Sequence, residues 1–317
     1  MKTNKISLKI GNYQLHSIPT GIFALDGGAM FGTVPKVLWE KSNPADNQNR
    51  IPMEARALLL KSADRNILID CGNGADFIAK YGEKLGSKFE EIYQIQKDGN
   101  SLLKSLEKQN LRPEDIDAVI LTHLHFDHAG GATTAKEGKL VPTFPKATYY
   151  LQKANYETAL NPNLREKASY FPSNFQPLLD HSCLTFLEGE TEIFPGISCW
   201  ISNGHTKGHQ MIFIQNHPST STSTPNPNPS FHFNSVEDDS AVLYCGDVVP
   251  TSSHIRLPWV MGYDLNPLLL IEEKANYLQK ALAKNTYLFF EHDPYCDLAS
   301  FQKNGSDFSI KERWVLE

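Results

Sequence analysis

The sequence lacks an apolar run long enough to cross a membrane, since no stretch reaches the roughly 18 apolar residues that such a span needs. The two early lysines are not followed by an apolar core, so we expect no signal peptide. Instead, Ile6, Leu8 and Ile10 alternate with polar residues, and this pattern predicts a first strand. We therefore expect no membrane partner.

The sequence also lacks CxxC spacing, an excess of basic charge and a dinucleotide-binding glycine motif. Its five scattered cysteines favour a reduced protein, for which we expect a cytoplasmic location. Lys and Arg number 30 against 36 Asp and Glu, a net charge of -6, which gives no electrostatic reason to expect nucleic acid as a partner. The glycines of residues 26–32 do not form GxGxxG, and we interpret this stretch as a loop rather than a core element.

Apolar runs and helical spacing predict a mixture of strands and helices within one domain, residues 1–317. One segment differs, because residues 216–236 are rich in Ser, Thr, Pro and Asn and predict a flexible surface insertion. The predicted strands cover residues 6–10, 13–18, 55–61, 66–70, 118–121, 147–151, 184–187, 197–202, 211–215, 241–245 and 286–290, and the predicted helices cover 75–85, 101–109, 152–160 and 267–284.

The most informative motif is HLHFDH at residues 123–128, which directly follows an apolar strand. His123 and His125 face the same side of an extended segment, because side chains alternate along a strand. Asp127 and His128 are adjacent and converge only where the chain leaves the strand, which the glycines that follow allow. Imidazole nitrogen and carboxylate oxygen without thiolate suit zinc, and also iron, manganese or cobalt. The motif therefore predicts a metal site.

Three later segments repeat one pattern, in which an apolar strand is followed by a ligand and then by glycine or proline. They supply His205 and His209, then Asp247, and then His292. Strand ends that meet at one edge of a sheet can assemble a site from distant parts of the sequence. From the residues alone, either His205 or His209 could be the ligand of its segment.

In this order, HLHFDH, GHTKGH, CGD and EHD resemble the metallo-β-lactamase superfamily, over residues 55 to 292. The resemblance implies an α+β fold, the four-layer αβ/βα sandwich of two mixed β-sheets with helices on the outer faces. It also implies two divalent metals at one edge, most simply zinc, with His205 in a supporting role through hydrogen bonds. The ligands carried over by position are His123, His125 and His209 for one metal, Asp127, His128 and His292 for the other, and Asp247 between them.

The implied activity is hydrolysis by a hydroxide that bridges the two metals, with Asp127 and Asp247 as catalytic residues. True β-lactamases lack an aspartate equivalent to Asp247. Residues 27–36 and 258–264 look like the branch of quorum-quenching lactonases and methyl-parathion hydrolases. We therefore expect a lactone of the acyl-homoserine type or a related ester as substrate. Phosphotriester, phosphodiester or thioester hydrolysis is the alternative, and a mononuclear iron dioxygenase of the same fold ranks below it.

This sequence differs from the lactonases at one place. Lactonases have a tyrosine shortly after the bridging aspartate, whereas Asp247 is followed here by Val248, Val249 and Pro250. Tyr244 or Tyr263 could replace that tyrosine in space. A small-molecule substrate with an apolar part is expected, and a homodimer is expected because relatives often dimerise. The residues predicted to line the substrate pocket are Met30, Phe31, His254, Trp259 and Tyr263.

Overall fold

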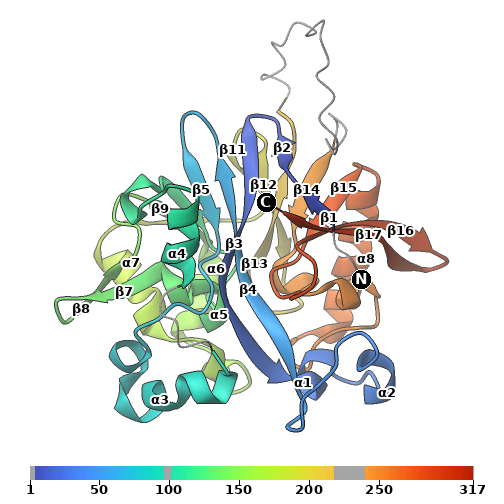
Figure 1. Cartoon of the computed structure of the whole chain (residues 1–317), viewed down its shortest axis with the longest axis horizontal. Helices are drawn as coiled ribbons and strands as arrows, with labels where there is room; N and C mark the ends of the chain where they lie inside the picture. Colours follow the sequence, from blue (N-terminus) through green and yellow to red (C-terminus); the bar gives the residue numbers. More distant parts are fainter. Residues whose placement is uncertain (1–3, 96–100, 218–239, 317) are drawn as a thin grey trace, which may run out of the picture.

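The computed structural model describes residues 4–95, 101–217 and 240–316. From residue 218 on, the predicted insertion at 216–236 lies outside these ranges, so its flexibility stays a prediction, as does the single-domain organisation. The described residues form two large β-sheets, with helices on either side (Figure 1). Among them, no helix is both long and apolar enough to cross a bilayer.

Both large sheets are mixed, because each contains parallel and antiparallel neighbours. A hairpin of β7 (Thr133–Lys136) and β8 (Lys139–Pro142) stands apart from them. The eight-stranded sheet has the order β1 (Asn4–Ile6), β17 (Asp307–Leu316), β16 (Leu298–Asn304), β15 (Thr286–Phe289), β14 (Ala241–Tyr244), β13 (His209–Ile214), β12 (Ile197–Ser202) and β11 (Glu192–Phe194). The seven-stranded sheet has the order β10 (Leu184–Leu187), β9 (Thr148–Gln152), β6 (Ala118–Ile120), β5 (Asn66–Ile69), β4 (Arg50–Lys61), β3 (Tyr13–Asp26) and β2 (Leu8–Ile10).

The helices cover the outer faces of the sheets. In Figure 1, α4, α6 and α7 lie outside the seven-stranded sheet and α8 lies outside the eight-stranded one. Leu102 and Leu106 of α4 pack on the seven-stranded sheet, and Leu270 and Leu278 of α8 pack on the eight-stranded sheet. The helices are α1 (Gly27–Phe31), α2 (Lys36–Trp39), α3 (Phe77–Tyr93), α4 (Ser101–Lys108), α5 (Phe126–Ala129), α6 (Lys153–Leu160), α7 (Gln176–Asp180) and α8 (Pro267–Leu282).

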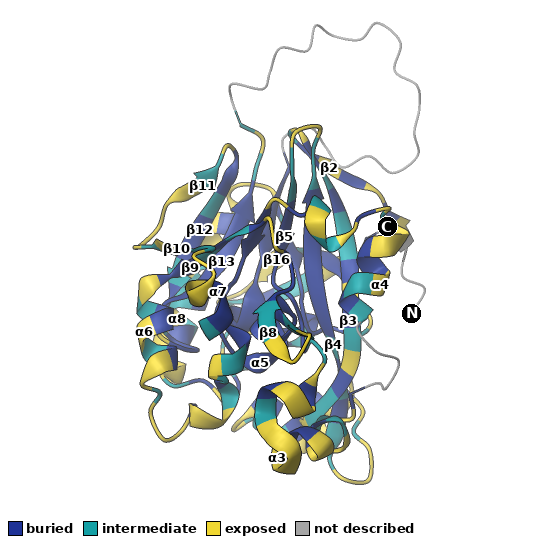
Figure 2. Cartoon of the chain, turned by 90° about the vertical axis from the view of Figure 1, so that its left-hand side faces the viewer, coloured by how far each residue is buried: buried dark blue, intermediate teal, exposed yellow. Residues whose placement is uncertain are grey.

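The central strands are buried on both faces, which explains their nearly continuous apolar sequences. In β4, Leu58 and Leu60 face the other sheet, while Ala57 and Leu59 face the helical layer with α4. Figure 2 shows the same division, because the strands are mostly dark blue and the exposed residues lie mainly on helices and loops. The four-layer sandwich expected from the resemblance is confirmed.

The first predicted strand, at residues 6–10, is wrong as a single strand. The chain changes sheets at Ser7, so that β1 pairs with β17 and β2 pairs with β3. Ile6, Leu8 and Ile10 all face the core between the sheets. The alternation of apolar and polar residues therefore continues across the change of sheet, so the sequence pattern does not reveal that the strand is divided.

The predicted loop at residues 26–32 is also wrong. Asp26 caps a short helix, α1, by accepting a hydrogen bond from the amide of Ala29 at 2.8 Å. Met30 and Phe31 are 1% and 0% exposed, so this segment belongs to the core. Glycine is needed at position 27, because a Cβ atom there would lie 2.5 Å from the ring of Trp39.

The five cysteines are all free thiols in the structure. The cytoplasmic location and the homodimer stay predictions.

Candidate metal centre

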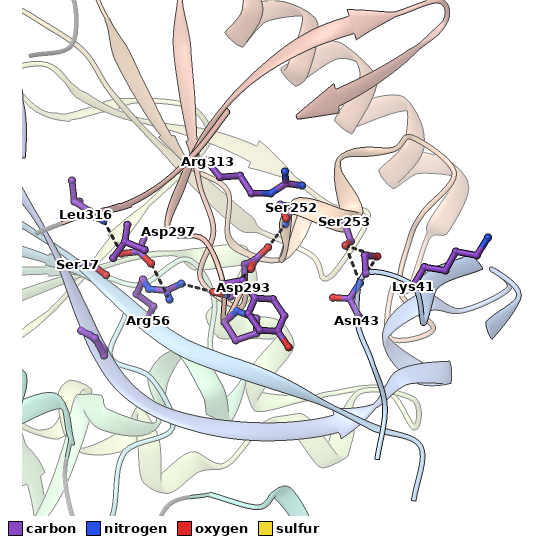
Figure 3. A pocket seen from close by; sticks show the side chains of 15 residues that line it. Ser17, Lys41, Asn43, Arg56, Ser252, Ser253, Asp293, Asp297, Arg313 and Leu316 are labelled. Atoms are coloured by element: carbon purple, nitrogen blue, oxygen red, sulfur yellow. Dashed lines mark hydrogen bonds and ion pairs between the residues drawn. The ribbon is translucent and has the colours of Figure 1, made fainter. Parts of the chain in front are cut away.

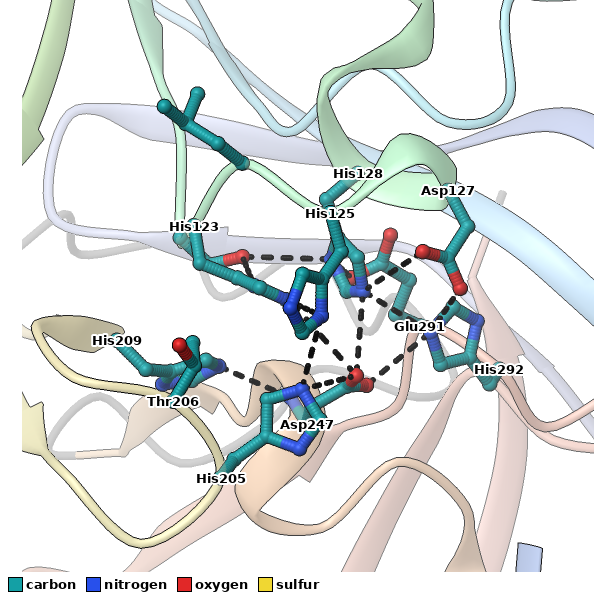
Figure 4. A network of polar contacts seen from close by, with 12 residues as sticks. His123, His125, Asp127, His128, His205, Thr206, His209, Asp247, Glu291 and His292 are labelled. Atoms are coloured by element: carbon teal, nitrogen blue, oxygen red, sulfur yellow. Dashed lines mark hydrogen bonds and ion pairs between the residues drawn. The ribbon is translucent and has the colours of Figure 1, made fainter. Parts of the chain in front are cut away.

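The HLHFDH segment leaves its strand through a single helical turn. His123 and His125 follow β6, and His125 precedes α5, which carries Asp127 and His128. The turn rotates the two adjacent side chains toward the side that the two preceding histidines face (Figure 4). The expected departure from the strand is present, and it takes the form of the short helix α5.

The other site residues follow strands of the second sheet. His205 lies after β12, Asp247 lies in a turn after β14, and His292 lies after β15. The strands β12, β14 and β15 run in one direction, because β12 and β14 are both antiparallel to β13 and β14 is parallel to β15. Their carboxyl ends therefore meet at one edge of the sandwich, where they face the HLHFDH segment.

One group of donor atoms consists of His123, His125, His205 and Asp247, whose ligand atoms all lie within 4.8 Å of one another. The Nδ1 atom of His125 lies 3.0 Å from Nε2 of His123 and 3.2 Å from Nε2 of His205. The Oδ2 atom of Asp247 lies 3.1 Å from Nε2 of His205. In tetrahedral zinc sites, bonds of about 2.0–2.1 Å place neighbouring nitrogens about 3.3 Å apart, so the spacing suits such an ion.

A second group consists of Asp127, His128 and His292. The Nε2 atoms of the two histidines lie 3.3 Å apart. Asp247 extends to this group as well, because its Oδ1 lies 3.2 Å from Nε2 of His292 while its Oδ2 faces His205. The two oxygens of one carboxylate thus face two different groups of nitrogens, which is the arrangement that a bridging ligand needs.

In four of the imidazoles, the Nδ1 atom points away from the centre and lies within hydrogen-bond distance of an oxygen atom. The Nδ1 atom of His205 lies 2.8 Å from Oδ1 of Asp264, and that of His128 lies 3.2 Å from Oδ2 of Asp70. Bonds of this kind fix the tautomer and direct the other nitrogen's lone pair inward. The Nδ1 atom of His123 likewise contacts the hydroxyl of Thr122 at 3.1 Å, and that of His292 contacts the carbonyl of Glu54 at 2.9 Å.

The electrostatics of the cluster fit a divalent cation. Burial lowers the pKa of His123 and of His125 well below its usual value, so both imidazoles are neutral. The Nε2 atom of His123 and the Nδ1 atom of His125 lie 3.0 Å apart, close enough for both to contact one cation. Burial by itself would raise the pKa of Asp247, but the imidazoles around it reverse this effect and hold its pKa well below the usual range. These donors can therefore hold divalent metal ions.

His209 is not brought to this centre, contrary to the role expected for it. Its Nε2 accepts a hydrogen bond from the amide of Asp247 at 3.1 Å, and the residue belongs to neither donor group. His209 begins β13 and is fixed by the sheet, whereas His205 lies in the turn before it. The structure reverses the expected roles, since His205 takes the position at the centre and His209 takes the supporting one.

Glu291 and Asp293 flank His292 in the sequence, and both are buried. Glu291 is fully buried beside the outer nitrogen of His128, and burial raises its pKa to about 8. Asp293 accepts a hydrogen bond from the amide of Ser252 at 2.9 Å (Figure 3). Both carboxylates therefore hold the segment that carries His292.

A cavity of about 390 Å³ lies beside the metal centre. Met30 and Tyr263 line it, as expected, and Met261 lies next to them. Arg165 and Glu166 also line it, although no local pattern in the sequence points to either. The other lining residues are Leu25, Tyr93, His125, Phe126, Asp127, Ala168, Ser169, His205, Asp247, Gly262 and His292.

Three residues predicted for the pocket lie behind its wall instead. Phe31 stacks on the ring of His254, with the ring centres 4.6 Å apart, and Trp259 packs edge-on against Phe31. The Nε2 atom of His254 contacts the carbonyl of Met30 at 2.8 Å. Burial lowers the pKa of His254 to about 3, so it is a neutral structural residue. These side chains support Met30 rather than contact the cavity.

The two tyrosines that could replace the lactonase tyrosine lie in different places. The hydroxyl of Tyr244 donates to the carbonyl of Arg56 at 2.9 Å, and the residue is fully buried outside the cavity. Tyr263 lines the cavity and is 40% exposed. Of the two, only Tyr263 can contact a substrate there.

Two glycine segments, residues 72–74 and 130–131, pack closely against each other, the second of them just after the HLHFDH motif, and Gly74 is one of the positions with no room for a side chain. A Cβ atom there would lie 2.2 Å from the carbonyl oxygen of Gly130, and its φ of +71° also disfavours a side chain. We expect Gly74→Ala to lower the free energy of unfolding by about 3 kcal/mol or more, measured by urea denaturation. The control is Gly138→Ala, where φ is +76° but nothing lies within 4 Å, and which should cost only about 1 kcal/mol. Equal losses in the two variants would contradict the close packing.

A mixed β-sandwich that gathers histidines and aspartates at one edge defines a class of metal-binding proteins. The sequence profile of the Metallo-beta-lactamase superfamily matches residues 52–292. The chain belongs to this superfamily.

Relatives and solved structures agree with this assignment. An N-acyl homoserine lactonase from Bacillus thuringiensis is 28% identical over 164 residues, which are 51% of this chain and 59% of the relative. The chain therefore spans less than two thirds of that relative's length. A probable metal-dependent hydrolase from Staphylococcus aureus has a TM-score of 0.80 at 29% identity, over 97% of this chain and 98% of that one. A dizinc quorum-quenching lactonase solved with its product, N-hexnoyl-L-homoserine, has a TM-score of 0.70 at 20% identity, over 97% and 96% of the two chains, and shows the shared fold.

Proposed function

We propose that this chain is a hydrolase that uses two divalent metal ions to open a lactone or a related ester. The observation that carries the proposal is the pair of donor groups that share Asp247 beside a cavity of about 390 Å³. The names of the curated relatives, N-acyl homoserine lactonases, support the choice of substrate class.

The proposed ligands follow the two groups. His123, His125 and His205 would hold one ion and Asp127, His128 and His292 the other, and Asp247 faces both groups. We propose zinc, because the donors are nitrogen and oxygen and one structural neighbour is a dizinc enzyme. When bound, such ions polarise a carbonyl oxygen and make water acidic enough to attack at neutral pH.

The chain's own residues would orient the substrate and move the proton. Asp127 lines the cavity and lies at its metal-side wall, so we propose that it carries a proton to or from the leaving oxygen. Leu25, Met30 and Met261 form an apolar wall that suits an acyl chain. The substrate we propose therefore combines an ester-like carbonyl with an apolar group.

Metal analysis and a substrate panel test the proposal together. The metal content of purified protein should reach two ions per chain, and acyl lactones should turn over faster than aryl esters, thioesters, phosphotriesters and phosphodiesters. Faster turnover of a phosphorus ester or a thioester would move the activity to that class. One iron per chain with oxygen consumption would indicate the dioxygenase alternative, and absence of metal would indicate a binding role.

The hydroxyl of Tyr263 is our candidate for the missing lactonase tyrosine. We expect Tyr263→Phe to lower kcat on a lactone by about tenfold or more with little change in stability, because a donor aimed at the carbonyl oxygen acts mainly in the transition state. Tyr244→Phe is the matched control, since its hydroxyl bonds the carbonyl of Arg56 outside the cavity. It should leave kcat unchanged and lower the free energy of unfolding by about 1 kcal/mol. A larger kcat loss in the control would contradict the assignment.

A further inference from the structure

His125 is the exception among the five histidines of the two donor groups. The other four turn Nδ1 outward to an oxygen atom, whereas His125 turns Nδ1 inward, toward the other donors. Its outward atom is therefore Nε2, which is buried without a hydrogen-bond partner in the described part of the chain. An imidazole that offers Nδ1 to a metal carries its proton on Nε2. This proton needs an acceptor, because the outer N–H of a ligand histidine is normally hydrogen-bonded.

A carboxylate without an assigned role lies on this side of His125. The Oε2 atom of Glu166 is 4.0 Å from Nε2 of His125, about 1 Å more than a hydrogen bond requires. Glu166 is 5% exposed and lines the cavity of about 390 Å³. The same segment is fixed to His125 in two further ways, because Tyr170 forms a β-bridge with His125 and packs its ring 4.7 Å from the imidazole, centre to centre. A small shift of one side chain would complete the contact.

Two donors hold the carboxylate of Glu166 in place. Its Oε1 accepts a hydrogen bond from Nδ2 of Asn163 and its Oε2 accepts one from the hydroxyl of Thr206, each at 2.8 Å. The oxygen of Thr206 lies 2.8 Å from the hydroxyl of Tyr170, and Tyr170 is the donor there because the proton of Thr206 points to Glu166. Since Thr206 directly follows His205 in the sequence, these bonds connect Glu166 with a second histidine of the same donor group.

The network also reaches the backbone of the HLHFDH motif. The Nδ2 atom of Asn155 lies 3.4 Å from the hydroxyl of Tyr170, and its Oδ1 accepts a hydrogen bond from the amide of Leu124 at 2.9 Å. Leu124 stands between the first two histidines of the motif. Bonds in a buried, connected network strengthen one another. The network therefore holds three histidines of one donor group from the side opposite to the metal.

We propose that Glu166 is a positioning residue for the ion held with His123 and His205, because it accepts the Nε2 proton of His125 and thereby directs Nδ1 toward that ion. The inference rests on the proposed function only for the presence of the metals. A carboxylate behind a ligand histidine fixes the ring and makes its inward nitrogen a stronger donor, and its loss typically costs about 10- to 100-fold in metal affinity.

The test titrates metal-free protein with cobalt(II), whose visible absorption depends on the geometry of its ligands. We expect Glu166→Ala to weaken one of the two sites about tenfold or more and to change the absorption bands of that site. Glu166→Gln keeps an oxygen that accepts the Nε2 proton, so its Kd should lie within about threefold of the wild-type value. The matched control is Glu157→Gln, which removes the same charge from an exposed position of α6 outside the cavity and should leave both sites unchanged.

A second variant keeps the test decisive if Glu166→Ala does not fold. Tyr170→Phe retains the ring beside His125 but removes the hydroxyl that donates to Thr206, and it should weaken the same site about threefold. A structural role alone would lower the free energy of unfolding and leave the cobalt spectrum unchanged.

The outcomes separate this inference from the proposed function. Wild-type affinity and spectrum in Glu166→Ala, or in Tyr170→Phe where the first variant does not fold, would overturn the role of Glu166 and leave the hydrolase proposal intact. Equal weakening of both sites would do the same, since Glu166 contacts only one donor group. A wild-type protein that takes up no cobalt would overturn the proposed function and this inference with it.

Discussion

Replacing His205 by alanine is expected to remove the metal ion held with His123 and His125 and to lower kcat/KM on a lactone by about a thousandfold or more. The Nε2 atom of His205 lies 3.2 Å from Nδ1 of His125 and 3.1 Å from Oδ2 of Asp247, so the variant loses a donor from the middle of the group. The remaining donors leave one coordination position to water, which weakens the site. Metal content per chain, measured by mass spectrometry, should fall from two toward one.

The matched control is His209→Gln, four residues along the same segment. The amide oxygen of glutamine can still accept the hydrogen bond that His209 Nε2 receives from the amide of Asp247. We therefore expect this variant to keep both metals and most of its activity. If His209→Gln lost a metal and His205→Ala kept both, the ligand assignment from the structure would be wrong and the one expected from the motif would be right.

The same pair of residues shows what the sequence could and could not predict about the site. The GHTKGH motif predicts that this segment supplies an imidazole, because an apolar strand precedes a turn rich in ligands, and the structure places that of His205 among the donor atoms. Which histidine reaches the centre depends on contacts with other parts of the chain. Asp264 holds Nδ1 of His205 from 59 residues away in the sequence, and Thr122 holds the amide of Gln210, which follows His209. Neither contact can be inferred from the spacing of residues within the motif.

The fold was predictable where burial of a strand produces a recognisable apolar pattern in the sequence. Strands such as β5 and β14 are buried on both faces and read as apolar runs. The terminal hairpin of β16 and β17 was not predicted, because only a few of its side chains, such as Phe301 and Phe308, reach the core. Cavity residues such as Arg165 were missed for another reason. The fold brings them to the cavity, and no motif in the neighbouring sequence marks them.

Asp247→Asn is expected to have the largest effect of all, because Asp247 faces both groups of nitrogens. The amide keeps the shape of the carboxylate but removes the negative charge that reduces repulsion between two neighbouring cations. We expect the metal content to fall well below two per chain and kcat/KM on a lactone to drop by about 10³- to 10⁴-fold.

A graded control separates a bridging role from the loss of any single ligand. Asp127 belongs to the second group alone, with its Oδ2 3.7 Å from Nε2 of His292. Asp127→Asn should therefore weaken one metal site and leave the ion of His123, His125 and His205 in place. If Asp247 bridges the two ions, titration of metal-free protein with zinc should show one weakened site in Asp127→Asn and two in Asp247→Asn. A single weakened site in both variants would mean that Asp247 binds one metal only, and the two-metal mechanism would lose its shared ligand.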